Sequence, residues 1–387
     1  MKQPDFLKMS SIQQAFTLAK QAGGEARLVG GVVRDWLAGR PLGDIDMAVN
    51  VPIERFCAYA KQANIRIIET GLAHGSVTML YDDEVIEVTQ TRADIKTDGR
   101  HAVIGFHPSF ATDARRRDFT MNAIYLDETG ALYDPLDGQA DLVNRRLVFI
   151  GDAAQRITED YLRILRYVRF VATIDDIAID DKIIAQIKAH SQGLYQLSGE
   201  RIIYELIKLF KGPHWAKAVH AMRQAGLDET LFGAPFLSLH DSHEQLVSWQ
   251  ARAMSCLSKT AFAAWQKQPF ARKDLTQMRY LDKPISKADY ACLASDDWHV
   301  IAYFETQDFH QRCVVQARYH EGALSQERLD ELRNYDAPPC PVSGHDLQQA
   351  GFVAGPALGG YLQQAKLVFA KSAYSLSREE IITSLKQ

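Results

Sequence analysis

The chain has 387 residues, which suggests roughly two to four structural units at the usual domain size. Hydrophobic residues make up 47% and charged residues 24%, a composition typical of globular proteins with a large core. With 44 Lys and Arg against 48 Asp and Glu, the formal net charge is -4. This balance excludes a strongly basic nucleic-acid coat protein, and by itself it argues weakly against any polyanionic partner.

The cysteines are few and scattered. Their number is odd and no C-x-x-C pair occurs, so neither a disulfide framework nor a zinc ribbon is expected. The N-terminal segment lacks the apolar core of a signal peptide, and no window approaches about 18 apolar residues without charge. We therefore expect a cytoplasmic protein that does not cross a membrane.

The first part of the chain predicts short strands interrupted by turns and one helix. An apolar run leads into the Gly30-Gly31 pair, and a second strand with alternating polarity follows the helix. Two further strands are joined by the Asp82-Asp83 turn. In chain order, the predicted elements are a strand at 26–29, a helix at 32–37, and strands at 44–49, 75–81 and 84–90.

After Gly151 the pattern becomes helical. Residues 159–172, 181–190 and 199–211 show helical periodicity, and from Pro213 onward the sequence is almost wholly helical in pattern. The fold class that we predict is therefore α+β, with a head built on a small sheet and a long helical remainder.

The Gly30-Gly31 pair lies between a predicted strand and a predicted helix. Glycines allow a phosphate to approach the backbone closely, and a helix N-terminus presents free N–H groups. Arg34, one turn into the helix, could bind a triphosphate oxygen. Taken by itself, the Gly30-Gly31 pair is explained equally well by a tight strand-to-helix turn that binds no ligand.

Carboxylates follow at a spacing that suits a cation. Asp44 and Asp46 are two residues apart in a predicted strand, so both side chains project from one face, where they repel each other unless a cation lies between them. Oxygen ligands of this kind suit Mg²⁺. Glu87, within the apolar strand 84–90, is the candidate for a third acid, and a Glu facing water on an edge strand is the alternative.

Two arginine-rich segments come next. In Arg115–Arg117, at least one side chain is expected to point inward, where Asp118 could orient it. The second segment is a predicted helix in which positions 160, 163, 166 and 170 lie near one face. A surface helix with a Glu159–Arg163 ion pair is the alternative interpretation of that segment.

Taken together, these blocks resemble the bacterial-type, or class II, tRNA nucleotidyltransferases, which belong to the superfamily of DNA polymerase β. The resemblance is dense over about residues 26–211 and weaker afterwards. It is carried, in order, by Gly30-Gly31-x-x-Arg34-Asp35, Asp44-x-Asp46, Arg116-Arg117-Asp118-Phe-Thr-Met-Asn122, Asp134-Pro135-x-x-Gly138-x-x-Asp141-Leu142, Glu159-Asp160-x-x-Arg163-x-x-Arg166-x-x-Arg169-Phe170 and Ser198-Gly-Glu-Arg-Ile202.

The resemblance implies four parts. Residues 1–148 would form a catalytic head with a small mixed sheet, and residues 149–211 a helical neck that carries a nucleotide-selecting helix. Residues 212–335 would form a helical body, and residues 336–387 a tail that binds tRNA. The Pro341–Leu347 segment, with Gly351, Gly355 and Pro356, resembles that tail element.

The resemblance also assigns roles to single residues. Asp44 and Asp46 would hold two catalytic Mg²⁺ ions, with Glu87 as a less secure third carboxylate. The remaining positions fall into two groups: Gly30, Gly31, Arg34 and Arg117 would hold the triphosphate, while Asp160 and Arg163 would read the base, beside Arg166 and Arg169 and with support from Glu159.

The base-reading pair makes chemical sense. Cytosine and adenine each present an amino donor beside a ring-nitrogen acceptor, which a carboxylate and a guanidinium match. Uracil and guanine present the reverse pattern, so they would leave buried groups unpaired. The implied activity is template-independent addition of C, C and A to the tRNA 3′ end from CTP and ATP, with release of pyrophosphate. The implied partners are the tRNA acceptor arm and nucleoside triphosphates, not DNA or a membrane.

Alternatives within and outside this class remain. The related family includes poly(A) polymerases and enzymes that add only CC or only A, and an inactive RNA-binding protein could share the fold. The segment 92–101 resembles the intact flexible loop of CCA-adding and A-adding members, with Asp98 and Arg100 as its notable residues. An ordinary Asp-Gly surface turn would also explain that segment.

Overall fold

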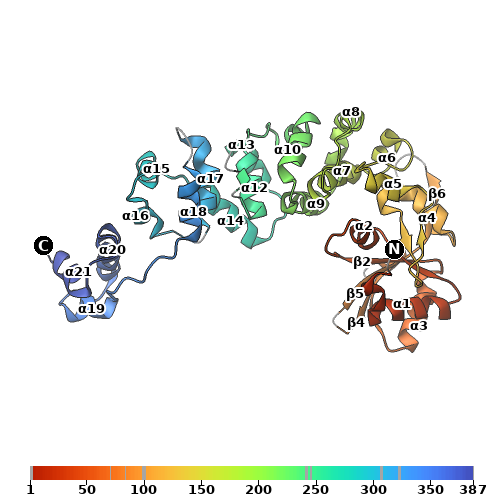
Figure 1. Cartoon of the computed structure of the whole chain (residues 1–387), viewed down its shortest axis with the longest axis horizontal. Helices are drawn as coiled ribbons and strands as arrows, with labels where there is room; N and C mark the ends of the chain where they lie inside the picture. Colours follow the sequence, from red (N-terminus) through yellow and green to blue (C-terminus); the bar gives the residue numbers. More distant parts are fainter. Residues whose placement is uncertain are drawn as a thin grey trace. The chain divides into compact units, whose positions relative to one another are not determined.

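The head predicted for the first part of the chain is built on one mixed sheet of seven strands (Figure 1). The computed structural model describes residues 3–69, 71–82, 84–97, 102–239, 243–244, 246–305, 308–320 and 324–386. The strands are β1 (Ala26–Val29), β2 (Ile45–Val49), β3 (Arg66–Ile68), β4 (Ser76–Tyr81), β5 (Glu84–Gln90), β8 (Tyr125–Leu126) and β9 (Leu132–Tyr133). A separate hairpin pairs β6 (Arg92–Thr97) with β7 (Ala102–Phe106).

The strand order is β3-β4-β5-β2-β1-β8-β9, so the two strands with predicted acids are central neighbours. β2 and β5 run parallel, whereas the other neighbouring strands run antiparallel. The register pairs Asp46 directly with Glu87. The expected strand at 44–49 begins one residue later, because Asp44 lies in the bend before β2.

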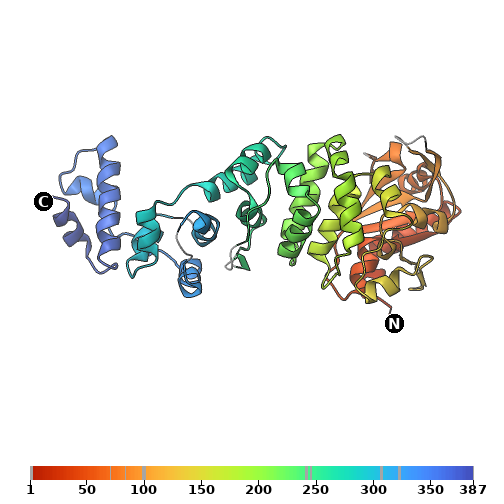
Figure 2. The same cartoon turned by 90° about the horizontal axis from the view of Figure 1, so that it is seen from above.

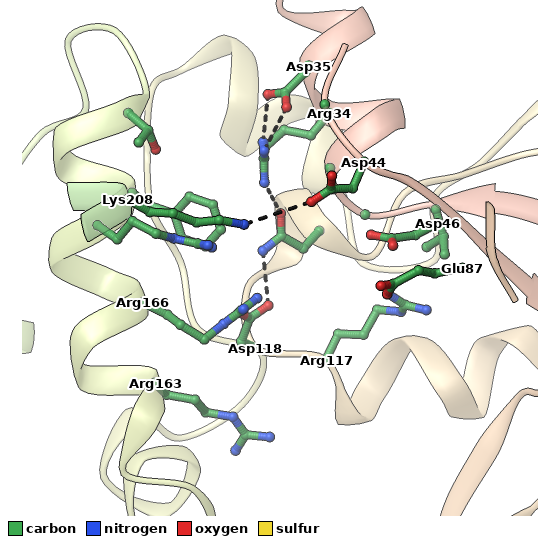
Figure 3. Close-up of a pocket in the computed structure, with 18 of the residues that line it drawn as sticks. Arg34, Asp35, Asp44, Asp46, Glu87, Arg117, Asp118, Arg163, Arg166 and Lys208 are labelled. Carbon is green, nitrogen blue, oxygen red and sulfur yellow. Dashed lines mark hydrogen bonds and ion pairs between the residues drawn. The ribbon is translucent and has the colours of Figure 1, made fainter. Parts of the chain in front are cut away.

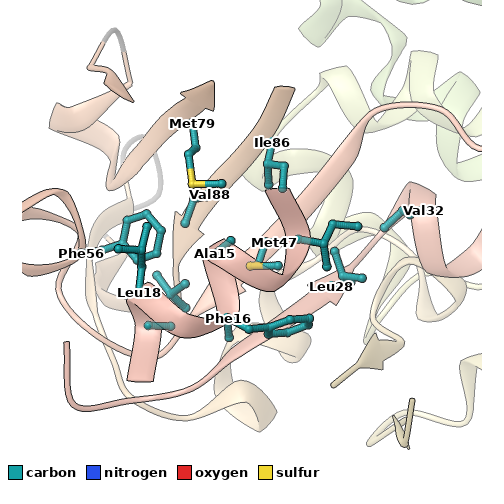
Figure 4. Packing of buried hydrophobic residues seen from close by; sticks show 14 of the residues in the cluster. Ala15, Phe16, Leu18, Leu28, Val32, Met47, Phe56, Met79, Ile86 and Val88 are labelled. Atoms are coloured by element: carbon teal, nitrogen blue, oxygen red, sulfur yellow. The ribbon is translucent and has the colours of Figure 1, made fainter. Parts of the chain in front are cut away.

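One face of this sheet carries the main core of the head. The helices α1 (Ser10–Gln21) and α3 (Ile53–Gln62) cover it, with Phe16 and Phe56 among the buried side chains (Figure 4). Met47 of β2 and Ile86 and Val88 of β5 point into this core and are almost fully buried. Since side chains alternate along a strand, Asp46 and Glu87 must project from the opposite face.

That opposite face is covered only in part. Ala48 packs with Phe110 and Ala114 of α4 (Phe110–Arg116) in a smaller cluster. Toward the start of β2 the same face carries Asp46, and on β5 it carries the exposed Glu87. Glu87 therefore faces outward from a central strand, so an edge-strand position does not explain its charge. The short helices α2 (Gly31–Leu37) and α5 (Gly138–Val143) complete the head.

Helices make up the rest of the first unit, which spans residues 1–231. They are α6 (Ala153–Glu159), α7 (Leu162–Thr173), α8 (Asp181–His190), α9 (Gly199–Lys211), α10 (Trp215–Gln224) and, at the boundary, α11 (Leu227–Phe232). The predicted helices at 181–190 and 199–211 are confirmed. The predicted helix at 159–172 is wrong at its start, because Asp160 has extended backbone angles between α6 and α7. Its side chain accepts a hydrogen bond from the Leu162 N–H (3.1 Å) and so stabilises the start of α7.

The second unit, residues 232–387, is helical throughout its described elements (Figure 2). In the part of the chain that the structure describes, no helix is long and apolar enough to cross a membrane. The helices of this unit are α12 (Trp249–Cys256), α13 (Lys259–Trp265), α14 (Arg272–Asp282), α15 (Lys287–Leu293), α16 (Trp298–Ala302), α17 (Phe309–Gln316), α18 (Gln326–Asn334), α19 (Gly344–Gln349), α20 (Pro356–Lys371) and α21 (Arg378–Ser384).

Candidate active site

A pocket of about 880 Å³ opens on the uncovered face of the sheet, within the first unit. Its walls come from the β1–α2 turn, the start of β2, the second half of β5, the helix α4 and the residue that follows it, and the helices α7 and α9 (Figure 3). Among the lining side chains, basic residues outnumber acidic ones. Except for Glu159 and the loop residues, the pocket brings together every predicted site residue, namely Gly30, Gly31, Arg34, Asp44, Asp46, Glu87, Arg117, Asp160, Arg163, Arg166 and Arg169.

Gly30 lies where the turn meets the acids. Its φ of 77° is in the left-handed region that favours glycine. A Cβ at this position would lie 3.4 Å from an Asp46 carboxylate oxygen and 3.8 Å from Nη1 of Arg117. The absence of a side chain therefore leaves the space between a carboxylate and a guanidinium free.

The acids form an electrostatically unfavourable group. Burial, together with the nearby charge of Glu87, raises the pKa of Asp46 to about 6, and Asp44 adds to the effect while Arg117 opposes it. Asp44 itself is 80% exposed. Negative charge is thus concentrated at the start of β2, on hard oxygen atoms.

These residues fit Mg²⁺. Within the described residues no group of three or more His, Cys, Asp or Glu side chains forms a metal site by itself. Mg²⁺, however, is commonly held by one or two carboxylates together with substrate phosphates and water. The exposed Asp44 and the partly buried Asp46 match that ligand set. A bound cation would offset the repulsion from neighbouring carboxylates that contributes to the raised pKa of Asp46.

Arg34 lines the pocket, and its guanidinium forms hydrogen bonds with neighbouring side chains. Its guanidinium donates to both carboxylate oxygens of Asp35 (3.1 and 2.9 Å) and to Oδ1 of Asn122 (2.7 Å). The same guanidinium lies over the ring of Phe170, 4.9 Å from its centroid. These contacts fix its orientation at the pocket wall, where it was predicted to meet a triphosphate.

Arg117 is the inward member of the arginine run. It donates to Asp113 (2.9 and 3.2 Å) and to the hydroxyl of Tyr125 (3.2 Å). Burial alone would lower the pKa of Arg117, but Tyr125 and Asp113 more than offset it and the pKa is raised. The expectation that Asp118 orients this arginine is wrong, because Asp113 lies one helical turn earlier on α4 and faces it directly.

Asp118 instead connects the head to α7. It accepts hydrogen bonds from Arg166 (2.6 Å) and from the amide of Asn122 (3.0 Å). Burial would raise the pKa of Asp118, but these partners hold it well below its usual range. Since Asn122 also accepts from Arg34, a continuous polar network joins α2, the segment after α4, and α7 (Figure 3).

The predicted base-reading residues lie at the start of α7. Arg163 pairs with Glu159 (2.8 Å) and donates to the backbone carbonyls of Arg156 (2.6 Å) and Arg116 (3.2 Å). Asp160 instead accepts from Nη2 of Arg201, at 3.2 and 3.1 Å from its two oxygens. Glu159 thus contacts Arg163 directly, as expected for a supporting residue, while Asp160 has a partner on α9 that sequence reasoning missed.

Arg166 and Arg169 share a buried acid that sequence reasoning also missed. Glu205 of α9 is almost fully buried and lies 3.8 Å from Arg166 and 3.1 Å from Arg169. The Arg169 contact is an ion pair without hydrogen-bond geometry at either atom. Burial lowers the pKa of Arg169 to about 10, and Glu205 limits that decrease. Helical spacing places Glu205 on the same face of α9 as Arg201, a signal that could have identified it.

Replacing Glu205 by Gln is therefore expected to reduce the free energy of unfolding by about 2 kcal/mol, because it leaves two adjacent arginines without their shared countercharge. Urea unfolding followed by circular dichroism measures this change. Glu200→Gln, at an exposed position on the same helix, is the matched control and should shift stability by about 0.5 kcal/mol or less. Equal midpoints for the two variants would contradict the assigned role of Glu205.

The α9 side of the pocket holds further side chains that sequence reasoning missed. Nζ of Lys208 lies 3.9 Å from an Asp44 oxygen and 4.3 Å from the ring centroid of Tyr204. Lys211 lines the pocket one turn further on. The predicted loop residues Asp98 and Arg100 lie outside the described residues.

A mixed sheet that presents acids beside a Gly-Gly turn and a cluster of arginines defines the nucleotidyltransferase class of enzymes. The family model described as "Poly A polymerase head domain" matches residues 26–148, and that described as "Probable RNA and SrmB- binding site of polymerase A" matches residues 176–239. Relatives that match over most of the chain identify the family within this class. The mitochondrial CCA tRNA nucleotidyltransferase 1 of Danio rerio is 34% identical over 94% of this chain and 87% of its own length. The chain belongs to the CCA tRNA nucleotidyltransferase family.

Bacterial relatives and solved structures agree with this assignment. The CCA-adding enzyme of Streptococcus uberis is 32% identical over 92% of each chain. The crystal structure of the Bacillus stearothermophilus CCA-adding enzyme in complex with CTP matches with a TM-score of 0.71 at 26% identity, over 100% of this chain and 98% of that one. The Thermotoga maritima CCA-adding enzyme complexed with tRNA matches with a TM-score of 0.72 at 17% identity, over 100% and 96%, which shows the shared fold.

Proposed function

We propose that this chain adds C, C and A to the 3′ end of tRNA, using CTP and ATP and releasing pyrophosphate. One observation carries the proposal. The acids Asp44 and Asp46 share a pocket with Asp160 and Arg163, an acidic and a basic side chain that together can match C and A without a nucleic-acid template. Relatives named as CCA-adding enzymes, one of them solved with CTP and another with tRNA, support the choice of substrates.

In the proposed mechanism, the RNA 3′-hydroxyl attacks the α-phosphorus of the nucleotide and pyrophosphate leaves. Asp44 and Asp46 would hold two Mg²⁺ ions, with Glu87 beside them, and bound Mg²⁺ would supply charge stabilisation and a more acidic hydroxyl. Arg34 and Arg117 would bind triphosphate oxygens, and both are already oriented by carboxylates. The protein therefore acts mainly by positioning its substrates and by stabilising charge.

The four-part division of the chain is part of this proposal. The head (1–148) would carry the acids, and the neck (149–211) the base-reading residues. Residues 212–335 would form the helical body, and the tail (336–387) would bind tRNA. The local basic clusters also revise what the net charge of -4 suggested, since positive charge is concentrated around the pocket. A cytoplasmic location remains a prediction, which fractionation of the source cells tests.

One assay tests the activity. The protein is given Mg²⁺ and tRNA that ends at the discriminator base, at C or at CC, each with labelled CTP, ATP or both. Growth that stops after CCA is the expected result. Long A tails on unrelated RNA would instead indicate a poly(A) polymerase, and addition of only CC or only A would indicate a partial enzyme. Absence of incorporation with every substrate would leave an RNA-binding protein on this fold.

The tRNA complex should be sensitive to salt. Because basic residues outnumber acidic ones along the pocket, we expect the logarithm of the affinity to fall steeply and linearly with the logarithm of the salt concentration. Filter binding between about 50 and 200 mM KCl measures the slope. A slope near zero would contradict binding through the basic pocket walls.

A further inference from the structure

The α9 side of the pocket combines an aromatic ring with two cations. Tyr204, Lys208 and Lys211, here called the α9 wall, are spaced by four and three residues, so they project from one helical face. The opposite face of α9 carries the buried residues Ile203, Leu206 and Phe210. Tyr204 is 54% exposed although it lines the pocket. An exposed ring beside lysines is the combination that stacks a nucleobase and binds a backbone phosphate.

The α9 wall lies next to Asp44, an acid whose side chain is 80% exposed. The Lys208 ammonium lies 3.9 Å from Asp44 (Figure 3). The Tyr204 ring centroid lies 4.3 Å from the same ammonium, so both residues adjoin the predicted reaction centre. The groups predicted to hold the nucleotide come from other elements, since Arg34 lies on α2, Arg117 follows α4, and Asp160 and Arg163 border α7. The α9 wall is therefore separate from the groups predicted to bind the base and the triphosphate.

We infer that the α9 wall binds the end of the acceptor RNA, with the 3′-terminal base stacked on Tyr204 and the adjoining phosphates near Lys208 and Lys211. This inference rests on the proposed function, because that function requires a second substrate whose 3′-hydroxyl lies beside Asp44. Charge complementarity favours a polyanionic strand at this wall. The exposed ring favours an unpaired base over a simple anion.

The test measures stacking without catalysis. A stem-loop RNA with an unpaired 3′ tail that ends in 2-aminopurine is titrated with each protein in the absence of nucleotides, and both anisotropy and fluorescence intensity are followed. Stacking on an aromatic ring quenches 2-aminopurine. Wild type and Tyr204→Phe should quench it, whereas Tyr204→Ala and Tyr204→Leu should not. The last two should also bind the RNA about 5- to 50-fold more weakly.

Matched controls separate this role from a general effect. Tyr195→Ala removes a tyrosine that is 67% exposed and does not line the pocket, so it should quench and bind as wild type does. Lys211→Ala should reduce the slope of log affinity against log salt by about 0.7, whereas Lys188→Ala, at an exposed position on α8, should not. Equal quenching by Tyr204→Ala and wild type would overturn the inference.

A second measurement excludes an indirect role of Tyr204 through Lys208. If the ring only holds the ammonium near Asp44, Tyr204→Ala should have no further effect on RNA affinity in a Lys208→Ala background. The inference expects the full loss in that background, and a loss that disappears there would overturn it. A raised KM for CTP with unchanged RNA affinity would place the wall on the nucleotide side and would also overturn it. The proposed function fails separately, if wild type binds and quenches the RNA but adds no nucleotide.

Discussion

Replacing Asp46 by Asn is expected to reduce nucleotide incorporation by about 10³-fold or more while making the metal-free protein more stable. The loss of activity follows from removing a carboxylate that is proposed to hold Mg²⁺ at the reaction centre. The gain in stability follows from the cost of keeping that carboxylate ionised in a partly buried place beside Glu87. Incorporation of labelled CTP and thermal unfolding in EDTA measure the two effects.

The raised pKa of Asp46 also predicts how the stability of wild type and of Asp46→Asn changes with pH. The pKa of Asp46 is about 6 in the folded protein, against about 3.9 for an Asp in an unfolded chain. Between these values folding favours the protonated form of Asp46, so this residue should contribute a loss of about 1 to 2 kcal/mol to wild type as pH rises from about 4 to 6, after allowance for screening. Asp46→Asn should lack this loss, and Mg²⁺ should stabilise wild type more than the variant.

Asp296→Asn is the matched control, since Asp296 is exposed in the second unit. It should leave incorporation and the pH dependence unchanged. Incorporation by Asp46→Asn within about tenfold of wild type would contradict the metal-binding role. An unchanged fall in stability between pH 4 and 6 would contradict the assigned pKa.

Four strands of the main sheet, β1, β2, β4 and β5, could be predicted from local apolar runs or alternation, whereas the short strands β3, β8 and β9 were not predicted. Ile45, Met47 and Val49 alternate with Asp46 and Ala48, and this alternation decides which side chains face the core. The pairing of β2 with β5 is not local, since Asp46 and its partner Glu87 are 41 positions apart in the sequence. The sequence therefore suggested a third acid, but only the parallel register places it directly beside Asp46.

The arginines of the site could be predicted as a group, but their partners could not. Arg117 was expected to pair with the adjacent Asp118, yet it pairs with Asp113 in the middle of α4, and Asp118 pairs with Arg166. Neighbours in sequence often point to different elements, so adjacency alone does not identify an ion pair. The break before α7 escaped notice for a similar reason, because helical periodicity continues across Asp160 while its side chain caps the next helix.

Replacing Arg163 by Ala is expected to reduce discrimination among the four nucleoside triphosphates more than it reduces the rate of nucleotidyl transfer. Discrimination of CTP and ATP against UTP and GTP should fall by about 10²-fold, because the guanidinium proposed to donate to the ring nitrogen of C and A is lost. Single-nucleotide incorporation on tRNA ending at the discriminator base or at CC measures kcat/KM for each of the four triphosphates.

The surroundings of Arg163 sharpen this expectation. Glu159 and the carbonyls of Arg156 and Arg116 hold the guanidinium at the pocket wall, so its orientation exists before a nucleotide binds. Glu159→Gln weakens the ion pair with Arg163 but leaves the Arg163 guanidinium in place. It should therefore also reduce nucleotide discrimination, but by less than Arg163→Ala does. Arg223→Ala, at an exposed position on α10, controls for the loss of a positive charge and should leave discrimination intact. If Arg163→Ala still excludes UTP and GTP, the base is read by other groups, and Arg163 serves only to join α6 and α7 to the end of α4.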